Sequence, residues 1–173
     1  MASPKTEAKR LMRRQPRPSG ELMFWLHDVE DPVNVGSAFR IADAVGAAEV
    51  LLSGITPVPP HRLISKVGRN KDKRVSWRSF DPEAEMPGLS SQGWKPIAVE
   101  ISPDALPYPR FPFPKRVMLV VGHEDHGIPK KIQQHCAHTV FIPMYGKGAS
   151  LNVHVALAVV AFHYRHGPML PDT

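Results

Sequence analysis

Three short segments of the chain combine glycine with polar side chains that could bind a ligand or take part in catalysis. They are residues 34–40 (Asn-Val-Gly-Ser-Ala-Phe-Arg), 120–127 (Val-Val-Gly-His-Glu-Asp-His-Gly) and 141–153 (Phe-Ile-Pro-Met-Tyr-Gly-Lys-Gly-Ala-Ser-Leu-Asn-Val). Each segment lies where an expected strand gives way to a loop or a helix. In an α/β protein such positions meet at one edge of the sheet, where ligands bind. The sequence therefore predicts a ligand crevice built from these three segments.

Each of these residues also has a simpler structural interpretation. Ser150 and Asn152 could cap the last helix, because such side chains accept hydrogen bonds from free helical amides. Asn34 could do the same for the first helix. Gly122 could be a turn glycine, and Glu124 a solvated loop acid. Taken singly these interpretations are favoured, but they do not explain why three such segments should lie around one sheet edge.

Two well-known catalytic motifs are absent despite partial similarity. Residues 146–150 (Gly-Lys-Gly-Ala-Ser) resemble a phosphate-binding loop but lack its spacing of Gly, four residues and then Gly-Lys-Ser/Thr. Residues 123–126 (His-Glu-Asp-His) are one residue short of the His-Glu-x-x-His zinc motif, which places both imidazoles on one helical face. The other histidines show no recognisable ligand spacing. No metal site is expected.

Length and composition indicate a single domain preceded by a basic arm. The chain has 173 residues and a net charge of +6, and residues 1–20 hold six lysines and arginines against one glutamate. We expect this segment to be a flexible arm that either contacts phosphates or is simply solvated. Residues 21–173 form the expected domain. The single cysteine, Cys136, and the lack of a long apolar run indicate a soluble cytoplasmic protein without a membrane partner.

Hydrophobic periodicity predicts strands that alternate with helices. The expected strands are 22–27, 50–52, 75–80, 95–101, 117–121 and 139–142. The expected helices are 38–45, a short helix from residue 61, 82–92, 129–135 and 151–166. This alternation predicts an α/β fold with a mainly parallel sheet and helices on both faces. Five apolar residues in succession at 117–121 are typical of a central strand that is buried on both faces.

Two segments have an unusual composition. Residues 102–116 contain five prolines with Tyr108, Phe111 and Phe113 between them, which favours an extended crossing whose aromatic rings pack on the sheet. The last helix is apolar on every side over residues 155–162. Because a helix without a polar face must be buried, this pattern favours a homodimer formed through the C-terminal helix.

A second basic stretch has only Asp72 as an opposing acid. It could contact nucleic-acid phosphates, or it could be a solvated helix and loop, and the sequence leaves both interpretations open. Its cationic residues are Arg62, Lys66, Arg69, Lys71, Lys73 and Arg74.

The three segments, in this order, resemble the SpoU (TrmH-like) branch of the SPOUT RNA methyltransferases. They read Asn-x-Gly-x-x-x-Arg, Gly-x-Glu-x-x-Gly and Ile-Pro-Met-x-Gly-x-x-x-Ser-Leu-Asn, and the resemblance extends over residues 22–166. It implies S-adenosylmethionine as the methyl donor, a ribose 2′-hydroxyl of RNA as the acceptor, and a dimer. It also implies a C-terminal trefoil knot whose loops wrap the cofactor, although general folding rules disfavour knots.

The resemblance further implies roles for individual residues. Arg40 matches the family's essential arginine and, because a guanidinium is effectively always protonated, we expect it to clamp a phosphate and stabilise developing negative charge. Asn34 would orient Arg40 or the ribose, and Gly36 would leave room for the nucleotide. In a dimer, Arg40 could serve the partner's cofactor. The expected catalytic residues are Arg40, Asn34, Glu124, Ser150 and Asn152. The expected donor-binding residues are Glu100, Gly122, Ile142, Met144 and Leu151.

The chain departs from the family pattern at three positions. His123 replaces the asparagine usual before the motif glutamate, Asp125 replaces a frequent glycine after it, and His154 replaces a small polar residue. Among RNA substrates we expect tRNA first and rRNA second. The alternative from a different functional class is a non-catalytic, dimeric RNA-binding module with the same fold.

Overall fold

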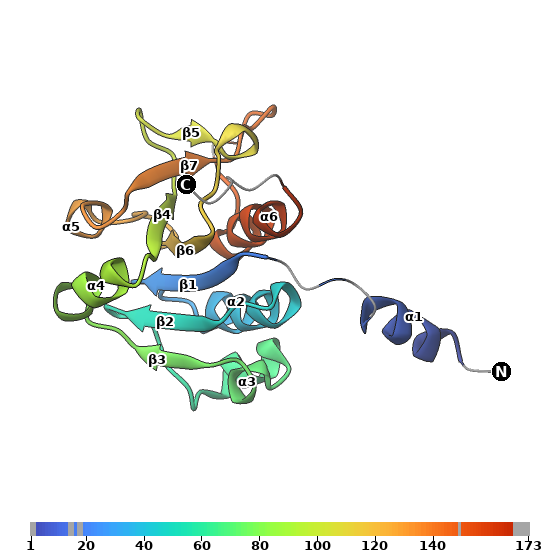
Figure 1. Ribbon diagram of the computed structural model, residues 1–173. Coiled ribbons are helices and arrows are strands. Elements are labelled where there is room, and N and C mark those ends of the chain that lie inside the picture. The colour runs from blue at the N-terminus through green and yellow to red at the C-terminus, as the bar shows by residue number, and fades with distance from the viewer. Residues whose placement is uncertain (1–2, 14–15, 17–18, 149, 168–173) are drawn as a thin grey trace.

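The computed structural model describes residues 3–13, 16, 19–148 and 150–167, which include a seven-stranded sheet. Its strands are β1 (Glu21–His27), β2 (Glu49–Ser53), β3 (Trp77–Ser79), β4 (Lys95–Val99), β5 (Leu106–Pro107), β6 (Arg116–Val121) and β7 (His138–Phe141). They lie in the order β3-β2-β1-β6-β4-β7-β5, and each strand pairs in parallel with its neighbours (Figure 1). The predicted parallel sheet is confirmed, with β6 at its centre.

Helices cover both faces of this sheet, as the sequence predicted. They are α2 (Pro32–Val45), α3 (Arg62–Gly68), α4 (Pro82–Ser91), α5 (Lys130–Gln133) and α6 (Val153–His166), with the 3₁₀ helices η1 (Lys71–Lys73) and η2 (Tyr108–Arg110). Helices α2 and α6 pack on one face, and α4 and α5 pack on the other. Helix α3 and η1 pack against α2. Within the described ranges, no helix is both long enough and apolar enough to cross a bilayer.

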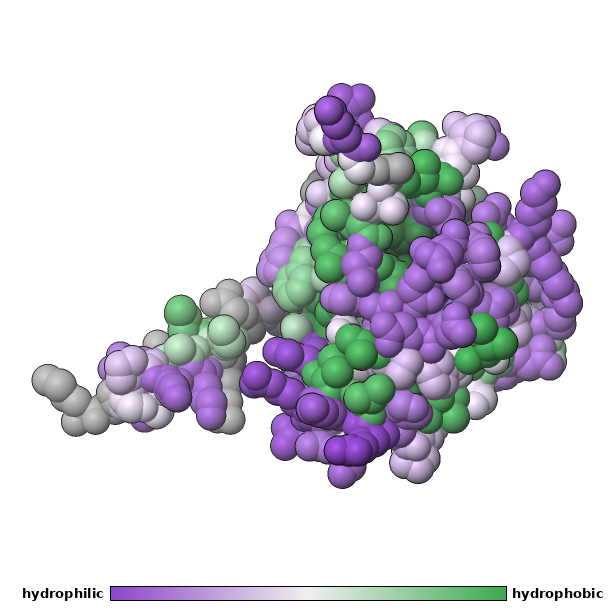
Figure 2. Space-filling view, turned by 180° about the vertical axis from the view of Figure 1, so that it is seen from behind, coloured by the Kyte–Doolittle hydropathy of each residue, from purple (hydrophilic) through white to green (hydrophobic). Residues whose placement is uncertain are grey.

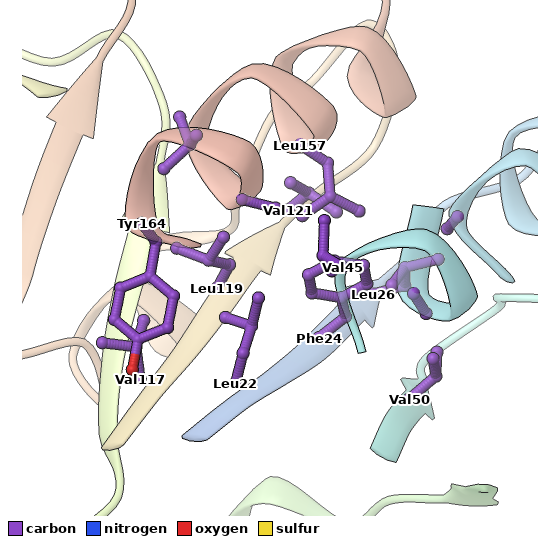
Figure 3. Packing of buried hydrophobic residues seen from close by; sticks show 14 of the residues in the cluster. Leu22, Phe24, Leu26, Val45, Val50, Val117, Leu119, Val121, Leu157 and Tyr164 are labelled. Atoms are coloured by element: carbon purple, nitrogen blue, oxygen red, sulfur yellow. The ribbon is translucent and has the colours of Figure 1, made fainter. Parts of the chain in front are cut away.

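The central strands bury side chains on both faces. Leu22, Phe24 and Leu26 of β1 join the cluster beneath α2 and α6, whereas Met23 and Trp25 join the cluster beneath α4 and α5. Strand β6 alternates in the same way, and Figure 3 shows its side chains meeting those of β1 and α6 in the first cluster. A strand buried on both sides must be a continuous apolar run, which is why periodicity identified these two strands so clearly.

Helix α2 begins earlier than the periodicity predicted. Asp31 is its N-cap, since its carboxylate accepts a hydrogen bond of 2.8 Å from the backbone N–H of Val33, and Pro32 occupies the first turn. The four apolar positions from Ala38 to Val45 marked only the buried face of the helix, so they did not show that it begins at Pro32. The expected end is confirmed, because Gly46 closes the helix in the left-handed region with φ of +63°.

The proline-rich crossing places its aromatic rings against the sheet, as predicted. Phe111 and Phe113 are buried in the cluster shared with β1 and β6, and their rings meet edge to face at 4.8 Å. Tyr108 is only partly buried and packs edge to face on His163 of α6 at 5.0 Å. The crossing therefore contributes to the core beside α6.

Two side chains near the end of α6 bind distant parts of the main chain. The Arg165 guanidinium donates hydrogen bonds of 2.6, 2.7 and 2.8 Å to the carbonyl oxygens of Gly20, Val45 and Gly46. The Tyr164 hydroxyl lies 3.0 Å from the carbonyl oxygen of Glu21 and 2.6 Å from that of Lys115. Free carbonyls at a helix end need such donors, so the last helix completes the end of α2.

The basic arm contains a helix that the sequence analysis did not predict. Helix α1 (Pro4–Arg13) has proline at its start and consists largely of residues with good helix propensity. It stands apart from the domain in Figure 1, and Figure 2 shows both apolar and hydrophilic residues on its surface. Its apolar residues Leu11 and Met12 are 65% and 75% exposed. The remainder of the predicted arm at residues 1–2, 14–15 and 17–18 lies outside the described residues.

Candidate active site

The three glycine-containing segments follow strands whose carboxyl ends lie at one edge of the sheet. Strands β1 and β6 are neighbours, with β2 and β3 on the far side of β1 and β4, β7 and β5 on the far side of β6. The carboxyl ends of parallel strands, with the loops that leave them, are the usual ligand site of such a sheet. Residues 34–40 follow β1, residues 120–127 include the end of β6, and residues 141–153 follow β7.

A cavity of about 400 Å³ lies beyond the carboxyl ends of β4, β6 and β7. Its volume lies in the range of small-molecule sites, about 300–1,000 Å³. Glu124 and Ser150 lie on its wall. So do all five residues expected to bind the donor, namely Glu100, Gly122, Ile142, Met144 and Leu151.

The loop after β6 is a tight turn that closes on a glycine. His123 and Gly127 exchange two backbone hydrogen bonds of 3.0 and 2.9 Å, and Gly127 has a φ of +67°. A Cβ on Gly122 would lie 2.3 Å from the carbonyl oxygen of Gly127, so no side chain fits there. One carboxyl oxygen of Glu100 accepts a 3.0 Å hydrogen bond from the backbone N–H of Ile128. The turn is thus fixed to the segment that directly follows β4.

Glu124 joins this turn to the segment after β1. Its Oε1 accepts hydrogen bonds from Nδ2 of Asn34 at 2.7 Å and from the backbone N–H of Asp31 at 3.1 Å, and its Oε2 accepts one from the N–H of Glu30 at 3.1 Å. Partial burial alone would raise the pKa of Glu124, but the hydrogen bonds outweigh burial and lower it. The carboxylate therefore remains ionised and holds the two segments together.

The two motif asparagines have different local roles. Asn34 is not a cap: it lies in the first turn of α2, is 3% exposed, and its Oδ1 is 2.8 Å from Nδ1 of His154. Asn152 is the N-cap of α6 and accepts a 3.2 Å hydrogen bond from the backbone N–H of His154. The capping interpretation is therefore wrong for Asn34 and confirmed for Asn152. Neither residue lines the cavity, whereas Ser150 does.

Arg40 lies outside the cavity. It is exposed on α2, and within the described ranges its guanidinium has no hydrogen bond or ion pair. A guanidinium of this kind can bind a phosphate or carboxylate of another molecule through two parallel hydrogen bonds. The structure thus brings the five residues expected to bind the donor to one cavity and leaves Arg40 exposed on α2, outside that cavity.

The family model described as the SpoU rRNA Methylase family matches residues 21–162. The chain belongs to the SpoU family. This confirms the resemblance drawn from the three motifs, which lie within the matched region.

Individual SpoU relatives act on different RNA classes. The chain is 30% identical over 145 residues to the 23S rRNA (guanosine-2'-O-)-methyltransferase RlmB of Acinetobacter baylyi, with 82% of this chain and 58% of that protein covered. It is 26% identical over 174 residues to the tRNA (guanosine(18)-2'-O)-methyltransferase of Escherichia coli, with 94% and 73% covered.

A solved SpoU-like structure shares the fold. The AdoMet-bound rRNA methyltransferase from Sinorhizobium meliloti matches with a TM-score of 0.80 and 25% identity, over 90% of this chain and 59% of that chain. This chain thus spans little more than half the length of the Acinetobacter protein and of the Sinorhizobium structure.

Gly36 of the first SpoU motif has a packing role, and the expectation that it leaves room for a nucleotide was wrong. A Cβ on Gly36 would lie 2.8 Å from the carbonyl oxygen of Ile64 and 3.0 Å from the Cβ of Val67, both in α3. A Cβ on Gly68 of α3 would in turn lie 3.0 Å from the carbonyl oxygen of Gly36. Helices α2 and α3 therefore approach each other at two glycines.

We expect Gly36→Ala to lower the free energy of unfolding by about 1–3 kcal/mol, because the new methyl group must displace α3. Where there is space for the methyl group, replacing glycine by alanine in a helix interior stabilises the helix by about 1 kcal/mol. Gly88→Ala in α4, where a Cβ meets nothing within 4 Å, is the matched control and should not destabilise the protein. Urea unfolding measures both variants. Unchanged stability of Gly36→Ala would contradict the close helix packing.

Two of the departures from the SpoU pattern, His123 and Asp125, line the cavity. Nδ1 of His123 accepts a 3.0 Å hydrogen bond from the backbone N–H of Asp125, and its Nε2 lies 3.4 Å from a carboxyl oxygen of Glu30. The ring also packs on His126, with 4.6 Å between centroids. These contacts stabilise the turn after β6. The described residues contain no cluster of three or more His, Cys, Asp or Glu side chains that could hold a metal ion.

The basic stretch forms α3 and η1 and packs beside α2. Lys71, which we expected to contact RNA, forms an ion pair with Asp43 of α2. Asp72, the acid within the basic stretch, is 7% exposed and accepts a 2.8 Å hydrogen bond from the Ser65 hydroxyl. Its carboxylate is therefore buried and does not face the surface cations. The cations left exposed on the surface are Arg62, Lys66, Arg69, Lys73 and Arg74.

Part of the cavity wall was not foreseen from the sequence. For the wall residues outside the three motif segments, the only signal was a position near the carboxyl edge of the sheet. They are Val99 at the end of β4, Ile101 in the loop after it, Ile128 after the turn, Gln133 in α5 and Ala156 in the first turn of α6.

Proposed function

We propose that this protein is an S-adenosylmethionine-dependent methyltransferase that modifies a ribose 2′-hydroxyl of RNA, with tRNA as the first substrate class. The observation that carries the proposal is the 2.7 Å hydrogen bond between Asn34 and Glu124, which joins two SpoU motifs beside the cavity. The Escherichia coli tRNA enzyme aligns with 94% of this chain, which favours tRNA. Ribosomal RNA is the second candidate, because the 30% identical relative is an rRNA enzyme.

The cavity suits a ligand that is part polar and part apolar. Carboxyl oxygens of Glu100 and main-chain groups of the turn after Gly122 can meet the hydroxyls and base of an adenosine. Met144 and Leu151, which are 38% and 39% exposed, can cover its apolar surfaces. When bound, S-adenosylmethionine supplies an electrophilic methyl group on a positively charged sulfur. The ionised carboxylate of Glu124 on the wall favours such a cation.

Arg40 has a role that needs no change of protonation. Its guanidinium would bind the phosphate next to the target ribose and stabilise negative charge as the hydroxyl oxygen forms its bond to the methyl carbon. The carbon–sulfur bond would break in the same step, S-adenosylhomocysteine would leave, and the hydroxyl proton would pass to water. Ser150 on the cavity wall and Asn152 at the start of α6 would complete the polar surroundings of the ribose. Fixing hydroxyl and methyl group in line converts a bimolecular reaction into an effectively unimolecular one.

The test is methyl transfer from radiolabelled S-adenosylmethionine to unmodified tRNA and, separately, to rRNA, followed by identification of the labelled nucleoside. Label in a 2′-O-methylated nucleoside of one RNA would support the proposal and give the substrate class. A folded protein that binds RNA but neither transfers label nor binds the donor in calorimetry would favour the non-catalytic RNA-binding module.

We also propose that the active protein is a homodimer formed through α6. In the single chain this helix exposes Val155 and Phe162 by 38% and 43%, while Leu157, Val160 and Ala161 are buried in the core. An apolar helix face of this kind is typical of a subunit interface.

Phe162→Glu should convert the dimer into a monomer, because it places a charge in a desolvated interface. Light scattering after gel filtration measures the change in mass. Leu106→Glu, at an exposed apolar residue of β5, is the control and should leave the mass unchanged. A wild-type protein that is monomeric at micromolar concentration would refute the dimer.

We propose that the exposed cations of α3 and η1 contact RNA phosphates. Replacing Lys73 and Arg74 by glutamine should weaken RNA binding and reduce the slope of log K against log salt by about 0.7–0.9 for each phosphate that is no longer neutralised. Lys95→Gln, at the amino end of β4, is the control. An unchanged salt slope in the double variant would exclude these two residues as phosphate contacts.

We also propose that the chain forms a C-terminal trefoil knot and that the protein is cytoplasmic. Membership of the SpoU family supports both proposals. The knot would involve the loops at residues 120–127 and 141–153. Burial raises the pKa of Cys136 to about 12, so its thiol is unreactive, as suits a protein that forms no disulfide in a reducing compartment.

A further inference from the structure

Three side chains from the three SpoU motif regions form one continuous hydrogen-bonded chain. Glu124, from the loop after β6, accepts from Nδ2 of Asn34 in α2 at 2.7 Å. Oδ1 of the same Asn34 lies 2.8 Å from Nδ1 of His154 in α6. His154 is one of the positions at which this chain departs from the family pattern, so the last link is a property of this protein.

The direction of each hydrogen bond follows from its partners. The ionised carboxylate of Glu124 can only accept, so the amide nitrogen of Asn34 must face it. The amide oxygen of Asn34 therefore faces His154, and because this oxygen can only accept, Nδ1 of His154 must carry the proton. Burial lowers the pKa of His154, more than the nearby charge of Asp31 raises it, so the neutral form dominates at neutral pH. Neutral His154 is thus the Nδ1–H tautomer.

This link fixes α2 relative to the cavity. Asn34 is 3% exposed and lies on the same helix as Arg40, so its two hydrogen bonds tie the start of that helix to the loop after β6 and to α6. His154 lies in the first turn of α6, directly after the loop in which Ser150 and Leu151 line the cavity. If the Asn34 amide loses one of its two partners, it has an unsatisfied polar atom, and this favours a different orientation of the Asn34 side chain.

We propose that His154 is a positioning residue: by donating from Nδ1 to Asn34 it fixes the placement of α2, and hence of Arg40, for methyl transfer. This inference rests on the proposed function. His154 does not line the cavity, so binding of S-adenosylmethionine should be independent of it.

The test compares three replacements of His154 with different geometry. In His154→Asn the amide nitrogen can occupy the place of Nδ1 and still donate to Asn34, whereas in His154→Gln it lies farther out, near the place of Nε2. We expect kcat to fall about 10- to 100-fold in His154→Ala and His154→Gln and to be largely restored in His154→Asn. The calorimetric Kd for S-adenosylmethionine should be unchanged in all three. His138→Gln, exposed at the amino end of β7, is the control and should retain the wild-type kcat.

A second measurement does not depend on activity. The ¹⁵N spectrum of the imidazoles should show His154 in the Nδ1–H form, and this signal should disappear in Asn34→Ala. An Nε2–H form, or a wild-type kcat in His154→Ala, would overturn the inference. Absence of methyl transfer by the wild-type protein with every RNA would instead refute the proposed function, while the spectrum would still report on the hydrogen bond.

Discussion

Arg40→Ala should lower kcat for methyl transfer by about 10²–10³-fold or more, since it removes the only group expected to stabilise charge at the reacting oxygen. The Kd for S-adenosylmethionine should not change, because Arg40 lies outside the cavity. Stability should not change either, since the exposed guanidinium has no partner within the described part of the chain. Single-turnover transfer and calorimetry measure the two effects separately.

Arg40→Lys is the matched variant. It keeps the positive charge but cannot form two parallel hydrogen bonds to one phosphate, so its activity should lie between those of wild type and Arg40→Ala. Full activity in Arg40→Ala would exclude any role of this residue in the reaction.

Mixing two inactive variants tests whether Arg40 serves the partner's cavity. A heterodimer of Arg40→Ala with a cavity variant such as Gly122→Ala would contain one complete site only if the arginine acts across the interface. Random mixing would then restore about a quarter of the sites. No recovery, in a mixture shown to exchange subunits, would place Arg40 and its donor in the same chain.

Gly122→Ala should weaken donor binding in a folded protein. Its Cβ would lie 2.3 Å from the carbonyl oxygen of Gly127 and 2.7 Å from the backbone nitrogen of Ile128, and backbone atoms cannot move aside as a side chain can. The turn after β6 must open, which should raise the Kd for S-adenosylmethionine by at least about tenfold and cost about 1–3 kcal/mol of stability.

RNA affinity separates loss of the cavity from general unfolding in this variant. The exposed cations belong to α3 and η1 and not to the turn after β6, so Gly122→Ala should still bind RNA with the wild-type salt dependence. Gly88→Ala again serves as the control for a glycine replacement without steric conflict. Wild-type donor affinity in Gly122→Ala would show that the turn does not form the binding site.

The sheet and its ligand edge could be predicted because burial imposes a pattern on the sequence. Strands β1 and β6 are buried on both faces and appear as apolar runs, and each is followed by a motif glycine or asparagine. Alternation of strands and helices then determines which ends of the strands lie together. The residues expected to bind the donor could be placed at one cavity for this reason, although other wall residues, such as Val99 at the end of β4, carry no motif.

The details of the site depend on contacts between distant residues, which the sequence does not display. Asn34 looked like a helix cap, yet Asp31 and Pro32 start the helix, so the asparagine amide is free to join Glu124 and His154. Gly36 was expected to leave room for a nucleotide, yet α3 packs directly against it. Spacing identifies which residues belong to a motif, but it does not show what each one touches.

The hydrogen bonds of Arg165 also have a consequence for synthesis of the chain on the ribosome. This side chain, near the end of the described sequence, binds main-chain oxygens of Gly20, Val45 and Gly46, which are made first. The end of α2 and the entry to β1 therefore wait for the last helix to emerge from the exit tunnel. Contacts that span most of the chain slow folding, and partly exposed apolar strands are prone to aggregate in the meantime. During translation the nascent protein should thus be most prone to aggregation before α6 is released.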